Sequence, residues 1–278
     1  MPILKAGEVG GRLRPEAAIP GDALVFCDRP QEPGLVAAMC ADEWESTVLG
    51  LRAGRISFEG EFAAAMKDEL ALYIDRQTEC LKAEYVLTRV PSRCSALLLY
   101  LQDRGFSVLE SLVEFSASSH AVAAQGEGGD VSFRAAREAD IARCADMICL
   151  NAHSRYETDP TLGPAVEQRA YRSWLVNSLA GREFFFVAEL GSDPVGFMTW
   201  RPADDRSGRI GLLAVAPVAV GRGVGRSLLR FGAGQMVAAQ VDEIRVGTSG
   251  ANLRAQRLYA KAGFSPRDTF FTLRKRFV

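Results

Sequence analysis

A glycine-rich turn between an apolar strand and an amphipathic helix is the segment of this sequence best suited to hold a ligand. Three glycines occupy alternate positions in residues 221–225, directly before a helical pattern. Such a turn exposes backbone N–H groups at the positive end of a helix dipole, where a pyrophosphate can bind. Glycine allows a close approach that a side chain would block, and Arg222 and Arg226 could add charged contacts. From the glycines alone, a plain turn is the alternative.

The turn resembles the acyl-CoA signature of the GNAT acyltransferase superfamily, Q/R-x-x-G-x-G/A, which follows a strand of the type Leu-x-Val-x-Pro. The family usually has Gln or Arg at the first signature position, where this chain has Val220, so Arg222 is the candidate to compensate. The six signature positions are Val220, Gly221, Arg222, Gly223, Val224 and Gly225.

A second signature of the same family, N-x-x-A-x-x-L-Y-x-x-x-G-F, matches residues 252–264 at every specified position. The two signatures occur in the family's order, and the resemblance to its catalytic domain covers residues 131–278. It implies an α/β (α+β) fold with a strongly curved mixed sheet that splays between its fourth and fifth strands. It also implies that acetyl-CoA is the cosubstrate and that its pantetheine arm is bound by Leu213, Ala214 and Val215, with Asn252 on the far side.

Within the second signature, the resemblance makes Tyr259 the residue on which the mechanism depends. Attack of an amine on a thioester expels a thiolate, and a phenol with a pKa of about 10 can protonate it as a general acid. The alternative is a half-buried tyrosine with a hydrogen-bonded hydroxyl group. Because no Ser/His/Asp or Cys/His arrangement is apparent, we expect direct attack without an acyl-enzyme.

Two further stretches resemble the TDP-fucosamine N-acetyltransferases and their relatives, which acetylate the ring amine of a nucleotide-linked amino-dideoxy sugar. One comprises residues 152–160 and 171–179, and the other comprises residues 43–50 and 54–56. With these stretches the resemblance extends over residues 43–278. It predicts an N-acyltransferase that moves acetyl from acetyl-CoA to a primary amine of a nucleotide-activated amino sugar.

Chemistry-bearing side chains in residues 153–159 make this segment a candidate acceptor site. Arg155 could neutralise a diphosphate, and His153 or Asp159 could take the amine proton, directly or through water. A surface or loop-capping role is the alternative for each of them. The acceptor-side candidates are His153, Ser154, Arg155, Tyr156 and Asp159.

The 278 residues are enough for two domains. Residues 117–130 are small and polar and contain three glycines, which predicts a flexible linker. We therefore expect a small α/β domain over residues 1–116, with the first 20 residues unassigned, and a catalytic domain over residues 131–278. Strands and helices alternate in the first domain, where we find no cluster of acids, bases or nucleophiles.

The composition excludes several classes of protein. No apolar run approaches the roughly 20 residues of a membrane span, and no signal core is present, so we expect a cytoplasmic protein. The six cysteines show no C-x-x-C spacing and only two histidines occur, which argues against a metal site and favours reduced core thiols. Residues 126–278 carry a net charge of +5 against −6 for residues 1–125. Within this part, residues 201–278 carry 14 basic and 5 acidic side chains, an excess that favours a phosphorylated small ligand, with a solvated basic face as the alternative. Nucleic acid is disfavoured, because its binding domains show denser basic stripes.

Three alternatives remain at this point. The catalytic domain could act on another small-molecule amine, or it could take its acyl group from a carrier protein or an aminoacyl-tRNA. A catalytically silent domain that binds CoA as a sensor or scaffold is a different class, which the retained Tyr259 disfavours. A homodimer is compatible with all of these alternatives.

Overall fold

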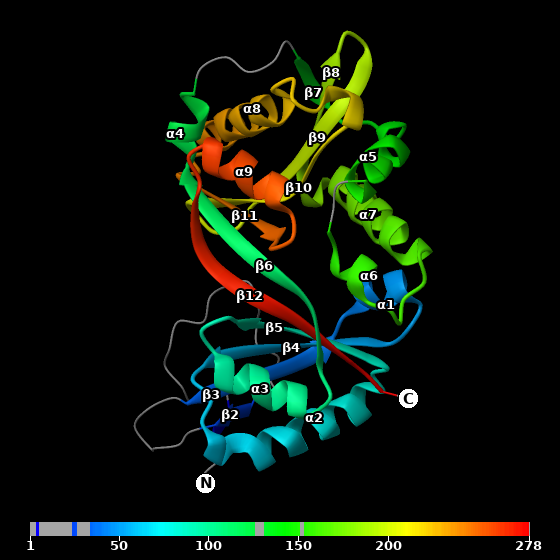
Figure 1. The fold of residues 1–278 in the computed structure, drawn as a ribbon, viewed down its shortest axis with the longest axis vertical. Helices are drawn as coiled ribbons and strands as arrows, with labels where there is room; N and C mark the ends of the chain where they lie inside the picture. The colour runs from blue at the N-terminus through cyan, green and yellow to red at the C-terminus, as the bar shows by residue number, and fades with distance from the viewer. Residues whose placement is uncertain (1–3, 6–23, 27–33, 126–130, 151–152, 278) are drawn as a thin grey trace. The chain divides into compact units, whose positions relative to one another are not determined.

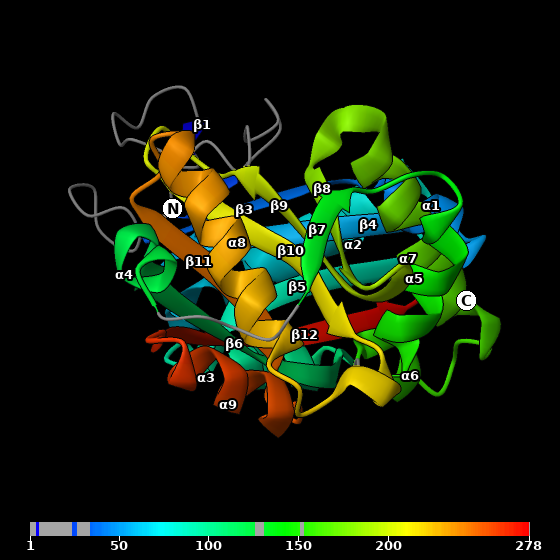
Figure 2. The same ribbon diagram turned by 90° about the horizontal axis from the view of Figure 1, so that it is seen from above.

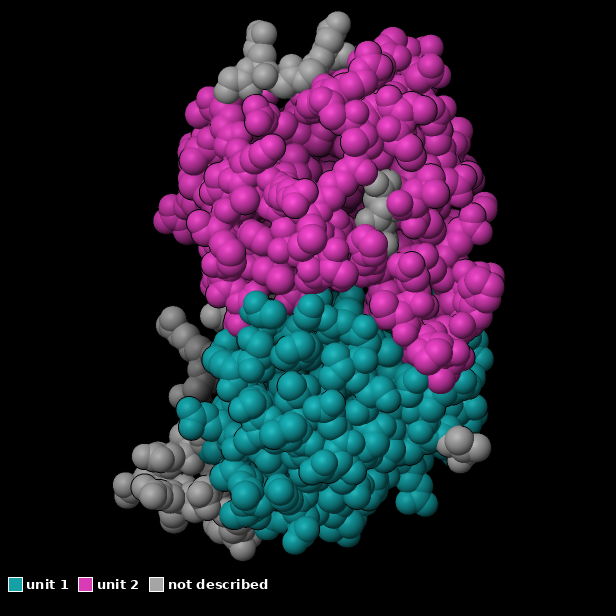
Figure 3. Space-filling model, viewed as in Figure 1, with its two compact units in different colours: residues 1–111, 269–278 teal, residues 112–268 magenta. Residues whose placement is uncertain are grey.

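The computed structural model of the chain describes residues 4–5, 24–26, 34–125, 131–150 and 153–277. The chain divides into two compact units (Figure 3). Unit 1 comprises residues 1–111 and 269–278, and unit 2 comprises residues 112–268. Strands β6 (Ser107–Ser118) and β12 (Ser265–Arg276) each belong partly to both units.

Among its described residues, unit 1 contains a mixed sheet and three helices. Its strands lie in the order β1-β2-β3-β4-β5-β12, and β4 and β5 pair in parallel. Its core includes Leu35, Leu70, Leu101 and Leu273, each with no exposed surface. The elements are β1 (Leu4–Lys5), β2 (Leu24–Phe26), β3 (Leu35–Ala41), α1 (Glu43–Leu49), β4 (Ala53–Gly60), a 3₁₀ turn η2 (Ala64–Met66), α2 (Lys67–Leu81), β5 (Tyr85–Pro91) and α3 (Ser95–Asp103).

Unit 2 contains a second part of the sheet, in the order β6-β11-β10-β9-β8-β7 (Figure 1). Its strands are β7 (Ser132–Ala135), β8 (Phe184–Leu190), β9 (Asp193–Pro202), β10 (Ser207–Val215) and β11 (Glu243–Ser249). Its helices are α4 (Ser119–Ala123), α5 (Asp140–Cys149), α6 (Arg155–Thr158), α7 (Ala165–Asn177), α8 (Val224–Ala238) and α9 (Leu253–Lys261). The short turns η3 (Ser178–Arg182) and η4 (Pro217–Ala219) complete the unit.

Helices cover both faces of the unit 2 sheet, as Figure 2 shows from above. Alternate residues of each strand point to opposite faces, so each strand contributes to two cores. Met198 and Trp200 pack in the core under α8, whereas Phe197 packs in the core under α5 and α7. We call these the α8 face and the α5/α7 face of the sheet.

Strands β10 and β11 pair over part of their lengths only. Their parallel pairing runs from Ser207↔Glu243 to Ile210↔Val246 and ends there. The register of β10 against β9 shifts between Ile210 and Leu213, which marks a β-bulge at that point. The expected mixed sheet with a splay between the fourth and fifth strands of the catalytic domain is therefore confirmed.

The segment expected as a linker is mostly regular structure where it is described. Residues 117–118 end β6, and α4 follows directly. Ser119 is fully buried and its hydroxyl donates a hydrogen bond to the Val241 carbonyl oxygen, so this segment is fixed to unit 2. The linker prediction is wrong for residues 117–123, and residues 126–130 lie outside the described part. The observed units divide between residues 111 and 112 and again between residues 268 and 269, so residues 269–278 lie outside the expected catalytic domain.

The cysteines differ from the expected core thiols. Cys144 is buried, and burial raises the pKa of its thiol to about 12. Cys40 and Cys80 are exposed, so the prediction is wrong for these two, and Cys27 lies outside the described residues. Among the residues described, no helix is long and apolar enough to cross the membrane. The same residues contain no group of three or more His, Cys, Asp or Glu side chains that could hold a metal ion.

Candidate active site

The glycine-rich turn forms the N-terminus of α8. Gly221 and Gly223 both have a φ of +81°, a left-handed conformation that glycine adopts without strain. No side chain caps this end of the helix. The N–H groups of the first turn of α8 are therefore free of a side-chain acceptor, and a 15-residue helix directs its dipole toward them. These features fit an anionic ligand such as the pyrophosphate of CoA.

The other signature residues of the turn divide between exposed and buried positions. Arg222 and Arg226 are exposed and have no ion-pair partner in the described part of the chain. Val220 is 39% exposed, whereas Val224 packs in the core. A Cβ atom at Gly225 would lie 3.1 Å from Leu258 Cδ2, so this glycine allows α8 to approach α9 closely.

The end of β10 lies beside the opening between β10 and β11. Leu213 and Val215 pack toward the α8 face, and Ala214 packs toward the α5/α7 face. In this part, β10 pairs with β9 alone, because its pairing with β11 has ended at Ile210. Asn252 is the N-cap of α9, and its Oδ1 accepts a hydrogen bond from the Ala255 N–H at 3.0 Å. The predicted contacts of these residues with pantetheine stay a prediction.

Tyr259 lies on α9 and packs on the α8 face. Its ring contacts those of Phe115 and Phe264, at centroid distances of 5.8 and 5.7 Å. The residue is 4% exposed, and burial raises the pKa of its hydroxyl group well above the ordinary value. The phenol therefore stays protonated over the whole physiological range.

Two of the five predicted acceptor-side residues serve as caps in the structure. Ser154 is the N-cap of α6, and its hydroxyl donates to Glu167 Oε1 at 2.6 Å. Asp159 is 1% exposed, and its Oδ1 accepts hydrogen bonds from the backbone and the hydroxyl of Thr161. These contacts match the alternative of a loop-capping role.

The other three acceptor-side candidates are His153, Arg155 and Tyr156. His153 is exposed. The Arg155 guanidinium donates to the Tyr156 hydroxyl at 2.7 Å and lies over the same ring at 4.6 Å from its centroid. Arg155 is therefore held in one orientation by its neighbour, and a role in acceptor binding stays a prediction for all three.

A carboxylate that the sequence did not single out lies against the bulge of β10. Glu183, just before β8, accepts hydrogen bonds at Oε2 from Trp174 Nε1 at 3.2 Å and from the Ser178 hydroxyl at 3.0 Å. A Cβ atom at Gly211 would lie 2.8 Å from both of its carboxylate oxygens and from Thr199 Oγ1. Its contacts come from the helical stretch of α7 and η3 and from strands β9 and β10, so no spacing in the sequence could have indicated all of them.

Because Gly211 leaves room for this carboxylate, we expect Gly211→Ala to displace it. The added methyl group would force the Glu183 side chain away from the bulge, while α8 and its turn would be untouched. If this carboxylate takes part in catalysis, the variant should lose kcat by tenfold or more, a rise of about 1.4 kcal/mol or more in the free energy of activation, and keep its Kd for acetyl-CoA. Unchanged kcat in a folded variant would show that the carboxylate position is unimportant.

Comparisons with known proteins agree with this geometry. Residues 149–264 match the model of the acetyltransferase (GNAT) family. The chain is 24% identical over 234 residues to a dTDP-fucosamine acetyltransferase of Escherichia coli O6:H1, covering 83% of this chain and 94% of that protein. It is 41% identical over 129 residues to a mycothiol acetyltransferase of Kineococcus radiotolerans, covering 44% of this chain and 39% of that protein.

A solved structure shows the same fold over most of the chain. A GCN5-related N-acetyltransferase from Sphaerobacter thermophilus superposes with a TM-score of 0.61 at 15% identity, covering 91% of this chain and 80% of that one. The splayed sheet, the uncapped glycine turn and the family match concern the same stretch of unit 2. Residues 149–264 therefore match the acetyltransferase (GNAT) family, and the chain has the fold of a solved GCN5-related N-acetyltransferase.

Proposed function

We propose that the protein transfers acetyl from acetyl-CoA directly to a primary amine of a nucleotide-activated amino sugar. The observation that supports this proposal is the end of the β10–β11 pairing at Ile210, with a buried tyrosine packed on one face of the sheet and a carboxylate on the other. Tyr259 packs on the α8 face, and Glu183 lies against Gly211 on the α5/α7 face. An amine can then enter from the side opposite to the departing thiolate.

In this proposal the donor is held by the backbone. The uncapped N–H groups of α8 bind the pyrophosphate, and Arg222 and Arg226 add charged contacts. The backbone of Leu213, Ala214 and Val215 binds the pantetheine arm, because β11 does not use these groups. Asn252 contributes from the start of α9 while its Oδ1 caps that helix.

In this mechanism Glu183 accepts one proton and Tyr259 donates another. Glu183 Oε1 accepts no hydrogen bond from the described residues, whereas Oε2 accepts two, so Oε1 takes the proton that the attacking amine loses. Tyr259 gives its hydroxyl proton to the leaving sulfur. The C–N bond forms, the C–S bond breaks, and solvent returns each residue to its starting protonation state.

The acceptor class is supported by the relative that aligns with most of the chain. That relative is a dTDP-fucosamine acetyltransferase, matched over 94% of its length. His153, Arg155 and Tyr156 stay the candidates that contact the acceptor on the α6 side, with Ser154 and Asp159 holding that segment. A mycothiol acetyltransferase matches with higher identity over a shorter stretch, which makes another small-molecule amine the second candidate.

The phosphate assignment predicts that Gly223→Asp weakens acetyl-CoA binding by more than tenfold, or about 1.4 kcal/mol. The substitution places a side chain and a negative charge at the exposed start of α8, where the pyrophosphate would lie. Isothermal titration with acetyl-CoA measures the effect.

Two further variants separate charge from backbone strain. Gly223→Asn tests the left-handed conformation without added charge, because Asn tolerates it. Gly234→Asp adds the same charge to an exposed position of α8 that has open space around it, and should bind normally. Unchanged affinity in a folded Gly223→Asp variant would contradict the assignment.

The acceptor itself is identified by product analysis. Mass spectrometry of mixtures of acetyl-CoA with TDP- and UDP-linked amino sugars and with unphosphorylated amines reports which compound is acetylated. A preference for an unphosphorylated amine would reject the nucleotide sugar and leave the acetyltransferase activity intact.

A further inference from the structure

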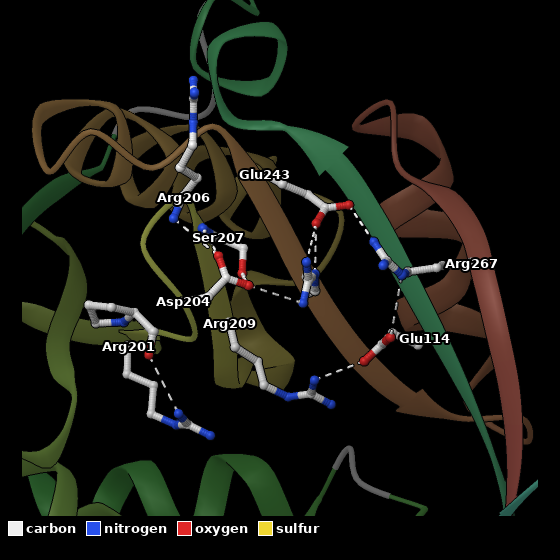
Figure 4. Close-up of polar contacts among 10 residues, drawn as sticks. Glu114, Arg201, Asp204, Arg206, Ser207, Arg209, Glu243 and Arg267 are labelled. Atoms are coloured by element: carbon white, nitrogen blue, oxygen red, sulfur yellow. Dashed lines mark hydrogen bonds and ion pairs between the residues drawn. The ribbon is translucent and has the colours of Figure 1, made fainter. Parts of the chain in front are cut away.

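Three arginines lie side by side on the three adjacent strands β9, β10 and β11 of the unit 2 sheet, near one end of each strand. Arg209 on β10 lies directly opposite Arg201 on β9 and opposite Arg245 on β11. The strand neighbours of these arginines, Trp200, Ile210 and Ile244, pack in the core on the α8 face. All three arginines therefore lie on the α5/α7 face, the same face as Glu183. Figure 4 shows Arg201 and Arg209 with the polar contacts around them. We call Arg201, Arg209 and Arg245 the arginine row.

Like charges directly opposite one another destabilise a sheet, so the row needs negative partners. Glu114 on β6 binds Arg209 at 2.8 Å, and Glu243 binds Arg245 at 2.7 Å. Glu243 is also shared with Arg267 of β12, at 2.6 Å. Asp204 lies 3.5 Å from Arg245 and accepts hydrogen bonds from Ser207. The acids are thus gathered at the β11 side of the row.

Arg201, at the β9 end, has no such partner. Its only recorded polar contact is with the Pro202 carbonyl oxygen at 3.5 Å, and no acid of the described residues lies within 4.0 Å of it. The side chain is exposed. With Arg267 included, four arginines face three acids, which leaves one positive charge in excess. The excess is located at Arg201.

The arginine row is separated from the Glu183 carboxylate by about two residues along β9 and β10. Arg201 is two residues from Thr199 on β9, and Arg209 is two residues from Gly211 on β10. A strand rises about 3.3 Å per residue, so these steps are roughly 7 Å. Thr199 and Gly211 are the two strand residues that lie against the carboxylate. A molecule whose amine reaches Glu183 would therefore have its other end over the row.

We propose that the arginine row binds a phosphate group of the acceptor, with Arg201 as its main contact. Guanidinium groups suit phosphate because their planar forks donate paired hydrogen bonds to its oxygens. The inference rests on the proposed function for the position of the amine, and it assigns the acceptor's phosphate to the sheet. A sugar ring between amine and diphosphate spans a distance of the same order as the step from Glu183 to the row.

The direct test is binding of inorganic pyrophosphate with CoA present at saturation, which fills the turn of α8. Isothermal titration should give a Kd for pyrophosphate that rises at least tenfold in Arg201→Ala. Arg201→Lys keeps the charge without the planar fork and should fall between the two. Arg143→Ala removes an exposed arginine of α5 without a recorded ion pair and should bind as wild type does.

Turnover gives a second readout on the same variants. Arg201→Ala should raise the KM for a TDP-linked amino sugar at least tenfold, and it should leave the Kd for acetyl-CoA unchanged. Thymidine diphosphate should inhibit wild type in competition with the acceptor and inhibit the variant less. If Arg155→Ala raised the KM for the acceptor more than Arg201→Ala does, the phosphate would be assigned to α6 and the proposal would be overturned.

Different results would reject the arginine row and the proposed acceptor. Equal pyrophosphate affinity in wild type and Arg201→Ala, or no pyrophosphate binding to CoA-saturated wild type, would reject the arginine row. Arg201-dependent pyrophosphate binding without acetylation of any amino sugar would keep the site and reject the proposed acceptor.

Discussion

Tyr259→Phe should lower kcat by roughly 10²- to 10⁴-fold and leave the Kd for acetyl-CoA close to the wild-type value. The change removes the hydroxyl group that would protonate the leaving thiolate. It keeps the ring, which packs between Phe115 and Phe264, so the fold of unit 2 should not change. Steady-state kinetics with a thiol-release assay measure kcat, and titration measures binding.

The raised pKa of Tyr259 gives this prediction a second readout. A phenol whose pKa lies above its ordinary value keeps its proton at higher pH, because burial disfavours the charged form. The kcat of the wild-type enzyme should therefore show no loss from Tyr259 ionisation up to about pH 10, the ordinary pKa of a phenol. A Phe variant with the wild-type rate would make Tyr259 structural and leave protonation of the thiolate to water.

We expect Glu183→Gln to reduce kcat to a similar extent, roughly 10²- to 10⁴-fold at neutral pH. The amide is nearly isosteric, and its oxygen can still accept hydrogen bonds from Trp174 and Ser178, so the local fold is retained. What is lost is a group that can accept a proton from the attacking amine. Raising the pH should partly restore the rate of the variant, because more of the amine then arrives unprotonated.

The high-pH rescue separates a base from a structural residue. A variant that only disturbed packing would stay slow at every pH. Glu157→Gln removes an exposed carboxylate on α6 and should behave as wild type does. Equal pH profiles for wild type and Glu183→Gln would remove Glu183 from the mechanism.

Local patterns were sufficient to predict the elements that we propose hold the donor. The glycines before α8 and the cap, tyrosine and glycine of α9 lie within single short segments, so their spacing is visible in the sequence. Strand β3 and helix α1 of unit 1 carry no such local pattern. Strand β3 reads Leu-Val-Ala-Ala-Met-Cys-Ala, without polar alternation, and α1 has only seven residues, too few to show a helical period.

The acceptor side depended on tertiary structure. Arg201, Arg209 and Arg245 meet only because of the register of three strands, which their separation in the sequence does not reveal. The stretch 117–123 is rich in small residues, which indicated flexibility, yet Ser119 is buried and bonded to Val241. Small polar residues also suit a close-packed helix start, and composition alone cannot separate the two cases.

Strand β6 belongs partly to both units, and this limits which fragments of the protein can be expressed alone. A fragment that starts at residue 131 would lack β6, so β11 would lose its partner along Glu243–Ser249 and present a bare edge to other chains. The same cut would remove Phe115, which packs against Tyr259. Such a fragment should aggregate when expressed alone, although it contains the whole family match. Recombination at this point would have the same effect, because residues 112–118, which pair with β11, precede it in the chain.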